Sequence, residues 1–115
     1  MPETAVALES IDKATARFFR VLGDPTRIRI ISLLASGPKN VSEIVEQIGL
    51  SQARISTDLA CLRWCEFVEA KKIGRQVEYS LNDPSIEQLL TLAKQMASVR
   101  EQHLASCTRI GPDWI

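Results

Sequence analysis

Apolar side chains recur at helical spacing in five stretches of the chain, and this pattern predicts five helices. The stretches are residues 11–22, 25–35, 41–48, 52–64 and 83–106. Capping residues mark most of their ends: Gly23, Asp24 with Pro25, Asn40 with Glu43, Gly49, Ser51, and Asp83 with Pro84. The third and fourth helices follow each other across a Gly-containing turn, which is typical of a helix-turn-helix.

Between residues 67 and 81 the apolar pattern changes to a period of two, which predicts strands. Val77, Tyr79 and Leu81 alternate with polar residues, and Gly74 with Arg75 supplies a tight turn between two short strands. A β-hairpin directly after a helix-turn-helix predicts a mainly α fold, a winged helix-turn-helix. We call the hairpin the wing and the helix at residues 52–64 the reading helix.

We expect residues 1–115 to form a single DNA-binding domain, because 115 residues is the usual length of one domain. The helix at about residues 83–106 is expected to serve for dimerisation, with a short tail after it. The first and last helices carry more apolar surface than one small domain can cover, which predicts a symmetric homodimer. Such a dimer presents its two reading helices to successive major grooves of double-stranded operator DNA.

Composition and charge exclude several classes of protein. The chain shows no N-terminal signal pattern and no apolar run of membrane-spanning length, so we expect a cytoplasmic protein with no membrane partner. It lacks a Gly-rich phosphate loop, a nucleophile elbow and paired catalytic carboxylates, so we expect no enzyme. The formal net charge is zero, so any DNA binding must come from a local basic surface.

Cys61 and Cys65 lie one helical turn apart at the end of the reading helix. Residues four apart on a helix have Cβ atoms about 5–6 Å from each other, so both thiolates can bind one metal ion. Thiolates favour soft ions over magnesium or calcium, so Cd(II) and Pb(II) fit, and Zn(II) and As(III) are chemically compatible. Free cysteines also pack as small apolar side chains, and the spacing alone leaves both interpretations open.

Polar and basic side chains define a candidate DNA surface. The reading helix and its cap provide Ser51, Gln52, Arg54, Ser56 and Thr57, and the wing provides Lys71, Lys72, Arg75 and Gln76. Gln and Arg pair with the edges of adenine and guanine, while Ser, Thr and Lys suit phosphates. Next to a helix-turn-helix, this group favours DNA binding over a merely solvated turn.

The segments LGDPTRIRIISLL, SQARISTDLACLR and GRQVEYSL together resemble the ArsR/SmtB family of metal-responsive repressors, over residues 14–105. LACLRWC followed by a distal cysteine resembles the CmtR-like type, which senses cadmium and lead. The resemblance implies an apo homodimer that represses by binding operator DNA and is released by Cd(II) or Pb(II). It also implies that Cys107 is the third thiolate ligand and comes from the other subunit.

Two features depart from the family pattern. Asp58 stands where the reading helix commonly has His. The closing helix has only His103 in place of the Asp, His and Glu ligands of the zinc, nickel and cobalt sensors, and we interpret His103 as a solvated side chain. Two alternative functions stay open: a thiol redox or persulfide switch on the same scaffold, and a constitutive DNA-binding protein whose cysteines only pack.

Overall fold

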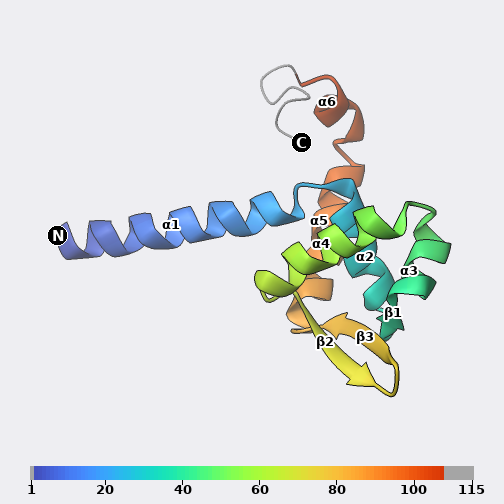
Figure 1. The fold of residues 1–115 in the computed structure, drawn as a ribbon. Coiled ribbons are helices and arrows are strands. Elements are labelled where there is room, and N and C mark those ends of the chain that lie inside the picture. Colours follow the sequence, from blue (N-terminus) through green and yellow to red (C-terminus); the bar gives the residue numbers. More distant parts are fainter. Residues whose placement is uncertain (1, 108–115) are drawn as a thin grey trace.

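The computed structural model describes the backbone of residues 2–107 and the side chains of residues 9–107. Figure 1 shows the arrangement of its helices and strands. The helices are α1 (Pro2–Leu22), α2 (Pro25–Leu34), α3 (Val41–Ile48), α4 (Gln52–Trp64), α5 (Ser85–Ser98) and α6 (Glu101–Ala105), and the strands are β1 (Lys39–Asn40), β2 (Val68–Ile73) and β3 (Gln76–Leu81). The predicted architecture is confirmed, because α3 and α4 form the helix-turn-helix and β2 and β3 form the wing.

The helix-turn-helix begins and ends at the predicted capping residues. The backbone N–H of Glu43 donates to Asn40 Oδ1 at 2.8 Å, and that of Asn40 donates to Glu43 Oε1 at 3.0 Å, a complete capping box for α3. Gly49 ends α3 with φ at 84°, a left-handed conformation that glycine adopts without a Cβ clash. The N–H of Arg54 donates to Ser51 Oγ at 3.1 Å, which caps α4. These bonds fix the direction in which α4 leaves the turn.

The wing belongs to a three-stranded antiparallel sheet with the strand order β1–β3–β2. β2 and β3 pair from Val68 opposite Leu81 to Ile73 opposite Gln76. The short strand β1 pairs with the other edge of β3, with Lys39 opposite Tyr79. The sequence does not predict β1, because two residues are too few to show a period of two.

One apolar core joins α4 to the rest of the domain. Its buried side chains are Leu22, Ile30, Ile31, Leu34, Ile44, Ile55, Leu59, Leu62, Phe67, Val68, Ile86 and Leu90. Ile55, Leu59 and Leu62 give α4 a buried inner face. The last turns of α1 reach this core, where Phe18 packs on Phe67 with ring centroids 4.8 Å apart, and the remainder of α1 extends away from the domain (Figure 1).

The closing segment forms two helices where the apolar pattern predicts one. α5 ends before Val99, and α6 begins after Arg100. Ser98 Oγ donates to the Gln95 carbonyl at 2.8 Å, and Arg100 Nη1 donates to the Met96 carbonyl at 2.9 Å. Side chains that bind nearby carbonyls compete with the backbone bonds that continue a helix, which accounts for the break.

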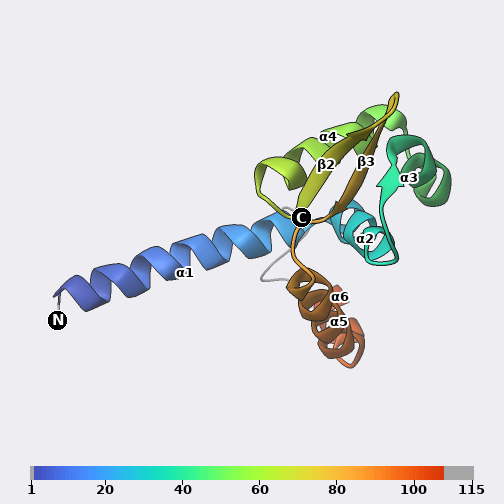
Figure 2. The same cartoon turned by 90° about the horizontal axis from the view of Figure 1, so that it is seen from below.

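The closing helices and the reading helix lie on opposite sides of the molecule. In Figure 2, α2 lies in the middle, with α5 and α6 on one side of it. α4 and the wing lie on the other side. Large apolar side chains are exposed along the closing helices: Leu92, Met96, Val99 and Leu104. No helix in the described part of the chain has the length and hydropathy needed to cross a membrane. The tail predicted after Cys107 falls on residues 108–115, outside the described residues.

Candidate functional site

α4 has two edges with different surroundings. The wing edge consists of Gln52, Ser56, Ala60 and Arg63, which are spaced by four, four and three residues and are all exposed. The cysteine edge consists of Arg54, Asp58, Cys61 and Cys65, spaced by four, three and four, with Cys65 as the C-cap. Such spacings place side chains in one row along a helix. The two rows lie on either side of the exposed face of α4, so both border the surface that would meet DNA.

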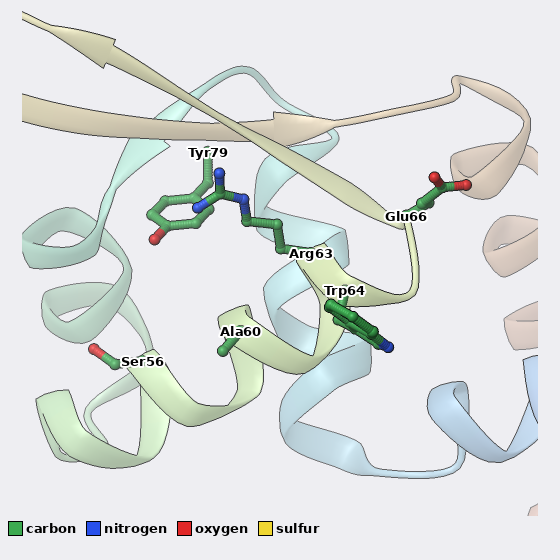
Figure 3. A pocket seen from close by; sticks show the side chains of 6 residues that line it. All are labelled: Ser56, Ala60, Arg63, Trp64, Glu66 and Tyr79. Atoms are coloured by element: carbon green, nitrogen blue, oxygen red, sulfur yellow. The ribbon is translucent and has the colours of Figure 1, made fainter.

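An open hollow lies between the wing edge and the wing. Its lining residues are Ser56, Ala60, Arg63, Trp64, Glu66 and Tyr79. Figure 3 shows Arg63 reaching from α4 toward the ring of Tyr79 on β3. Arg63 is not among the contacts predicted from the sequence, although its spacing of seven residues from Ser56 places it on the same helix edge. An exposed guanidinium in this position suits a phosphate group.

All of the predicted DNA contacts lie at exposed positions on α4, its N-cap or the wing. Four of them also make side-chain hydrogen bonds within the protein, and those of Arg54 go to Asp58 and Thr26. Ser51 Oγ caps α4, Thr57 Oγ1 donates to the Ala53 carbonyl at 2.9 Å, and Gln76 Oε1 accepts from Asn40 Nδ2 at 3.0 Å. These bonds compete with contacts to DNA.

The two lysines of the wing point to opposite faces of the sheet. Lys71 pairs with Glu78 and Lys72 with Val77, and neighbouring residues in a strand alternate between faces. Tyr79, two residues from Val77, lines the hollow beside α4. Lys72 therefore shares the face that borders the hollow, whereas Lys71 lies on the other face opposite a carboxylate.

The structure brings Cys61 and Cys65 together, as their spacing predicts. Both are free thiols, Cys61 half-buried and Cys65 exposed. The Cys65 backbone N–H donates to the Cys61 carbonyl at 3.0 Å and closes the last turn of α4. Burial raises the pKa of the Cys65 thiol, and the nearby Cys61 raises this pKa further, while the positive charge of Arg27 lowers it. The two thiols therefore lie close enough to interact.

Cys107 is not brought to this pair within one chain. It follows α6 as a half-buried free thiol, and its N–H donates to the Leu104 carbonyl at 3.3 Å. Within the described part of the chain, no three or more Cys, His, Asp or Glu side chains come together to hold a metal ion. His103 also stays away from the cysteine pair.

Asp58 is a buried carboxylate held by two arginines. Its side chain is 7% exposed. Arg54 Nε donates to Asp58 Oδ2 at 3.1 Å, and Arg27 Nη1 lies 3.6 Å from Asp58 Oδ1. The hydrogen bond and the negative charge of Asp58 raise the pKa of Arg54. The departure from the family pattern at this position thus has a structural explanation: Asp58 binds protein groups rather than facing solvent.

Comparison with known proteins places the chain among bacterial regulators. The family described as bacterial regulatory protein, arsR family, matches residues 24–70. A probable mercury resistance operon repressor from Streptomyces lividans is 42% identical over 96 residues, which cover 84% of this chain and 77% of that protein. The HTH-type transcriptional regulator CmtR of Mycobacterium tuberculosis is 39% identical over 82 residues, 71% of this chain and 70% of that protein.

A solved structure supports the same assignment. The homodimeric winged helix-turn-helix DNA-binding domain of a possible ArsR-family transcriptional regulator from Mycobacterium bovis superposes with a TM-score of 0.71 at 26% identity, over 78% of this chain and 83% of that one. Such proteins are transcriptional regulators and not enzymes, as predicted. The chain belongs to the ArsR/SmtB family of metal-responsive transcriptional repressors, and its likeness to CmtR is confirmed.

Proposed function

We propose that the protein represses transcription as a metal-free homodimer on operator DNA and is released when a soft metal ion binds Cys61 and Cys65. The position of these two free thiols on one edge of α4 carries the proposal. Their donor set fits a thiophilic ion, because side chains four apart on a helix are neighbours. A ligand bound there acts directly on the helix that reads DNA.

We assign the third ligand to Cys107 of the partner subunit. The described part of one chain forms no three-residue ligand group, and Cys107 ends a segment whose exposed apolar side chains suit a dimer, Leu92, Met96 and Val99 among them. The homodimeric state of the Mycobacterium bovis domain supports this arrangement.

A subunit-mixing experiment tests the origin of the third ligand. Cys61→Ser and Cys107→Ser homodimers each lack a complete site, but a mixed dimer regains one if Cys107 crosses the interface. Unfolding and refolding the two proteins together should restore strong metal binding that neither shows alone. If the mixture binds no better than its parts, the ligand does not come from the partner.

We propose Cd(II) or Pb(II) as the effector, as the CmtR-like residues imply. The name of the Streptomyces lividans relative adds Hg(II) to the ions to be tested. Zn(II) usually takes four ligands in proteins, and As(III) is also compatible with thiolates. When bound, the ion supplies a cross-link between α4 of one subunit and the closing segment of the other.

We propose that α4 enters the major groove and that the wing grips the flanking backbone. Gln52 and Ser56 face the groove from the wing edge of α4, as amide and hydroxyl groups suited to base edges. Arg63 on α4 and Lys72 and Arg75 on the wing are exposed cations that bind phosphates. These local cations make DNA binding possible in a chain with no net charge. Because its proposed ligand is operator DNA, we expect the protein to act in the cytoplasm.

The decisive test is release from DNA by metal. An operator duplex, selected from a random library with the reduced protein, is labelled and followed by fluorescence anisotropy. Cd(II), Pb(II) and Hg(II) should each be tried, and at least one should release the wild-type protein. Cys61→Ser should bind the duplex like wild type but stay bound when the ion is added. Release of Cys61→Ser by the same ion, at the same concentration, contradicts the proposal.

A thiol redox switch is the rival function that the free cysteines favour. Redox-sensing thiols usually have a lowered pKa and an exposed thiolate, whereas burial and the neighbouring Cys61 raise the pKa of Cys65. A raised pKa slows attack of the thiol on an oxidant, whereas a soft metal ion displaces the thiol proton as it binds. Release of the metal-free dimer by hydrogen peroxide or a persulfide donor, with no release by metal, would support the rival.

A further inference from the structure

The cysteine edge of α4 carries a network of charged side chains next to the thiols. Asp58 lies three residues before Cys61, between it and Arg54 along one row of the helix. Among the described side chains, Asp58 is the charged one that is buried. A carboxylate is buried only at considerable cost unless it is paired, so its partners determine how this edge of α4 is held.

These partners fasten α4 to the segment between α1 and α2. Arg54 Nη2 donates to Thr26 Oγ1 at 3.2 Å and lies 3.5 Å from Asp24 Oδ1. Arg27 Nη1 reaches both carboxylates, 3.6 Å from Asp58 Oδ1 and 3.9 Å from Asp24 Oδ2. We call Asp24, Thr26, Arg27, Arg54 and Asp58 the α4 clamp. It sets the orientation of the reading helix relative to α2 on the side opposite the wing.

Within the clamp, two of the three guanidinium nitrogens of Arg54 contact protein groups. Its Nε binds Asp58, and its Nη2 binds Thr26 and faces Asp24. Bidentate recognition of guanine needs two neighbouring donors of one guanidinium. Every such pair on Arg54 includes Nε or Nη2, the nitrogens that contact Asp58, Thr26 and Asp24, so we infer that its main role is to hold α4 rather than to read a base.

Arg27 connects the clamp to the cysteine pair and to α1. Its Nε donates to the Val21 carbonyl in the last turn of α1 at 2.6 Å. Its positive charge acts on the Cys65 thiol and lowers the pKa that burial and Cys61 raise. One guanidinium thus contacts the end of α1, the start of α2 and Asp58 of α4, within electrostatic reach of Cys65.

We propose that Arg27 and Asp58 are positioning residues that orient α4 for operator binding and couple that orientation to the cysteine pair. This inference rests on the proposed function, because it names the residues through which the thiols act on the reading helix. In the metal-free protein Arg27 pairs with Asp58 and Asp24. A metal ion that ties Cys61 and Cys65 to the partner subunit pulls on the edge of α4 that Asp58 anchors, which weakens the pairing of Arg27 with Asp58 and frees α4 to move.

The test measures the operator Kd with and without Cd(II), or the ion to which wild type responds, for Arg27→Gln, Arg27→Lys and a control. Allosteric coupling typically changes affinity by about 5–150-fold. Arg27→Gln should keep the wild-type metal stoichiometry and sulfur-to-metal absorption band, yet its ratio of Kd values should fall to within about twofold of unity. Its metal-free Kd should rise, since α4 is less well oriented. Arg27→Lys keeps the charge and should restore part of the coupling.

Arg29→Gln is the matched control. Arg29 lies two residues further along α2, is exposed, and forms no ion pair among the described side chains. This variant should keep the wild-type ratio. Equal coupling in Arg27→Gln and wild type, or an equal loss in Arg29→Gln, overturns the inference while leaving the proposed function intact.

Two further outcomes keep the test decisive. If Arg27→Gln unfolds at the assay temperature, Thr26→Val takes its place, because it removes the bond to Arg54 without changing charge. Thr26→Val should also raise the metal-free Kd, and an unchanged Kd overturns the positioning role. If wild type shows no metal absorption band at all, the proposed function fails, and the coupling role of Arg27 fails with it.

Discussion

The two edges of α4 differ in what holds their side chains. On the wing edge, Ser56, Ala60 and Arg63 border an open hollow and face solvent. On the cysteine edge, Asp58 is buried and bound by arginines, and the thiols follow one turn later. One helix of thirteen residues therefore has an edge left open for a ligand and an edge occupied by the protein itself.

This difference suits the wing edge to DNA recognition and the cysteine edge to the control of DNA binding. A side chain that reads DNA must exchange water for base and phosphate contacts, so it is exposed in the free protein. A control element must hold a contact that differs between two states, because a ligand shifts an equilibrium only through differential interaction. A buried ion network adds little net stability, but it fixes geometry and is costly to break. The cysteine edge fits control, and the wing edge fits recognition.

The largest expected contrast between the edges is in stability. Asp58→Ala removes the buried carboxylate that accepts from Arg54, and the loss of this charged hydrogen bond should lower the free energy of unfolding by about 2 kcal/mol. Ser56→Ala on the wing edge should change it by less than about 0.5 kcal/mol. Urea denaturation at one fixed protein concentration measures both, since a dimer's stability depends on concentration. Similar values for the two variants would contradict the distinction.

The second contrast is in base preference. Gln52→Ala should cost about 1–3 kcal/mol at one base position and relax the preference there. Arg54→Gln should weaken binding to all sequences equally, because Arg54 holds α4 and does not read a base. Binding to a library of duplexes with single base changes measures both variants. A base preference altered at one position by Arg54→Gln would show that Arg54 leaves the clamp to read DNA.

The third contrast lies within the wing and is smaller. Lys72 shares the face of Tyr79 beside the hollow, and Lys71 lies on the opposite face across from Glu78. Lys72→Gln should reduce the slope of log affinity against log salt by about 0.9, the loss of one phosphate contact. Lys71→Gln should leave that slope unchanged. DNA titrations at several salt concentrations measure both slopes. A larger change of slope in Lys71→Gln than in Lys72→Gln would contradict the assignment of the two lysines to their faces.

The smallest effect is expected at the turn where both edges of α4 end. Glu66 has a φ of 64° and is the non-glycine residue with a positive φ among the described residues. A left-handed conformation is strained for a residue with a Cβ, so Glu66→Gly should raise the free energy of unfolding by up to about 1 kcal/mol. Glu66→Ala keeps the Cβ and should give no gain. Equal effects of Gly and Ala in thermal unfolding would assign the change to the lost carboxylate.

Much of the fold can be predicted from the sequence because its signals are local. Asn40 with Glu43, Gly49 and Ser51 mark ends of α3 and α4, and each bond needs only a few neighbouring residues. β1 and the break at Val99 escape such prediction. The first depends on pairing with a strand far along the chain, and the second on side chains that compete for carbonyls.

In the candidate site, too, local features can be predicted from the sequence and contacts between distant segments cannot. The proximity of Cys61 and Cys65 follows from helical spacing, and the structure confirms it. The partners of Asp58 do not follow from spacing, because Arg27 and Asp24 meet it only after α2 packs against α4. For the same reason Arg54 has the sequence position of a base contact but lies in an internal network. The three-cysteine metal site stays a prediction.

The most direct test is a titration of the reduced, metal-free dimer with Cd(II), followed by sulfur-to-metal charge transfer in the ultraviolet. The same titration is made on Cys61→Ser and Cys107→Ser. A metal sensor built on the reading helix predicts one strong equivalent per subunit in wild type and markedly weaker binding in both variants. Absence of a charge-transfer band with Cd(II), Pb(II) and Hg(II) would contradict it and leave the thiols to packing or redox chemistry.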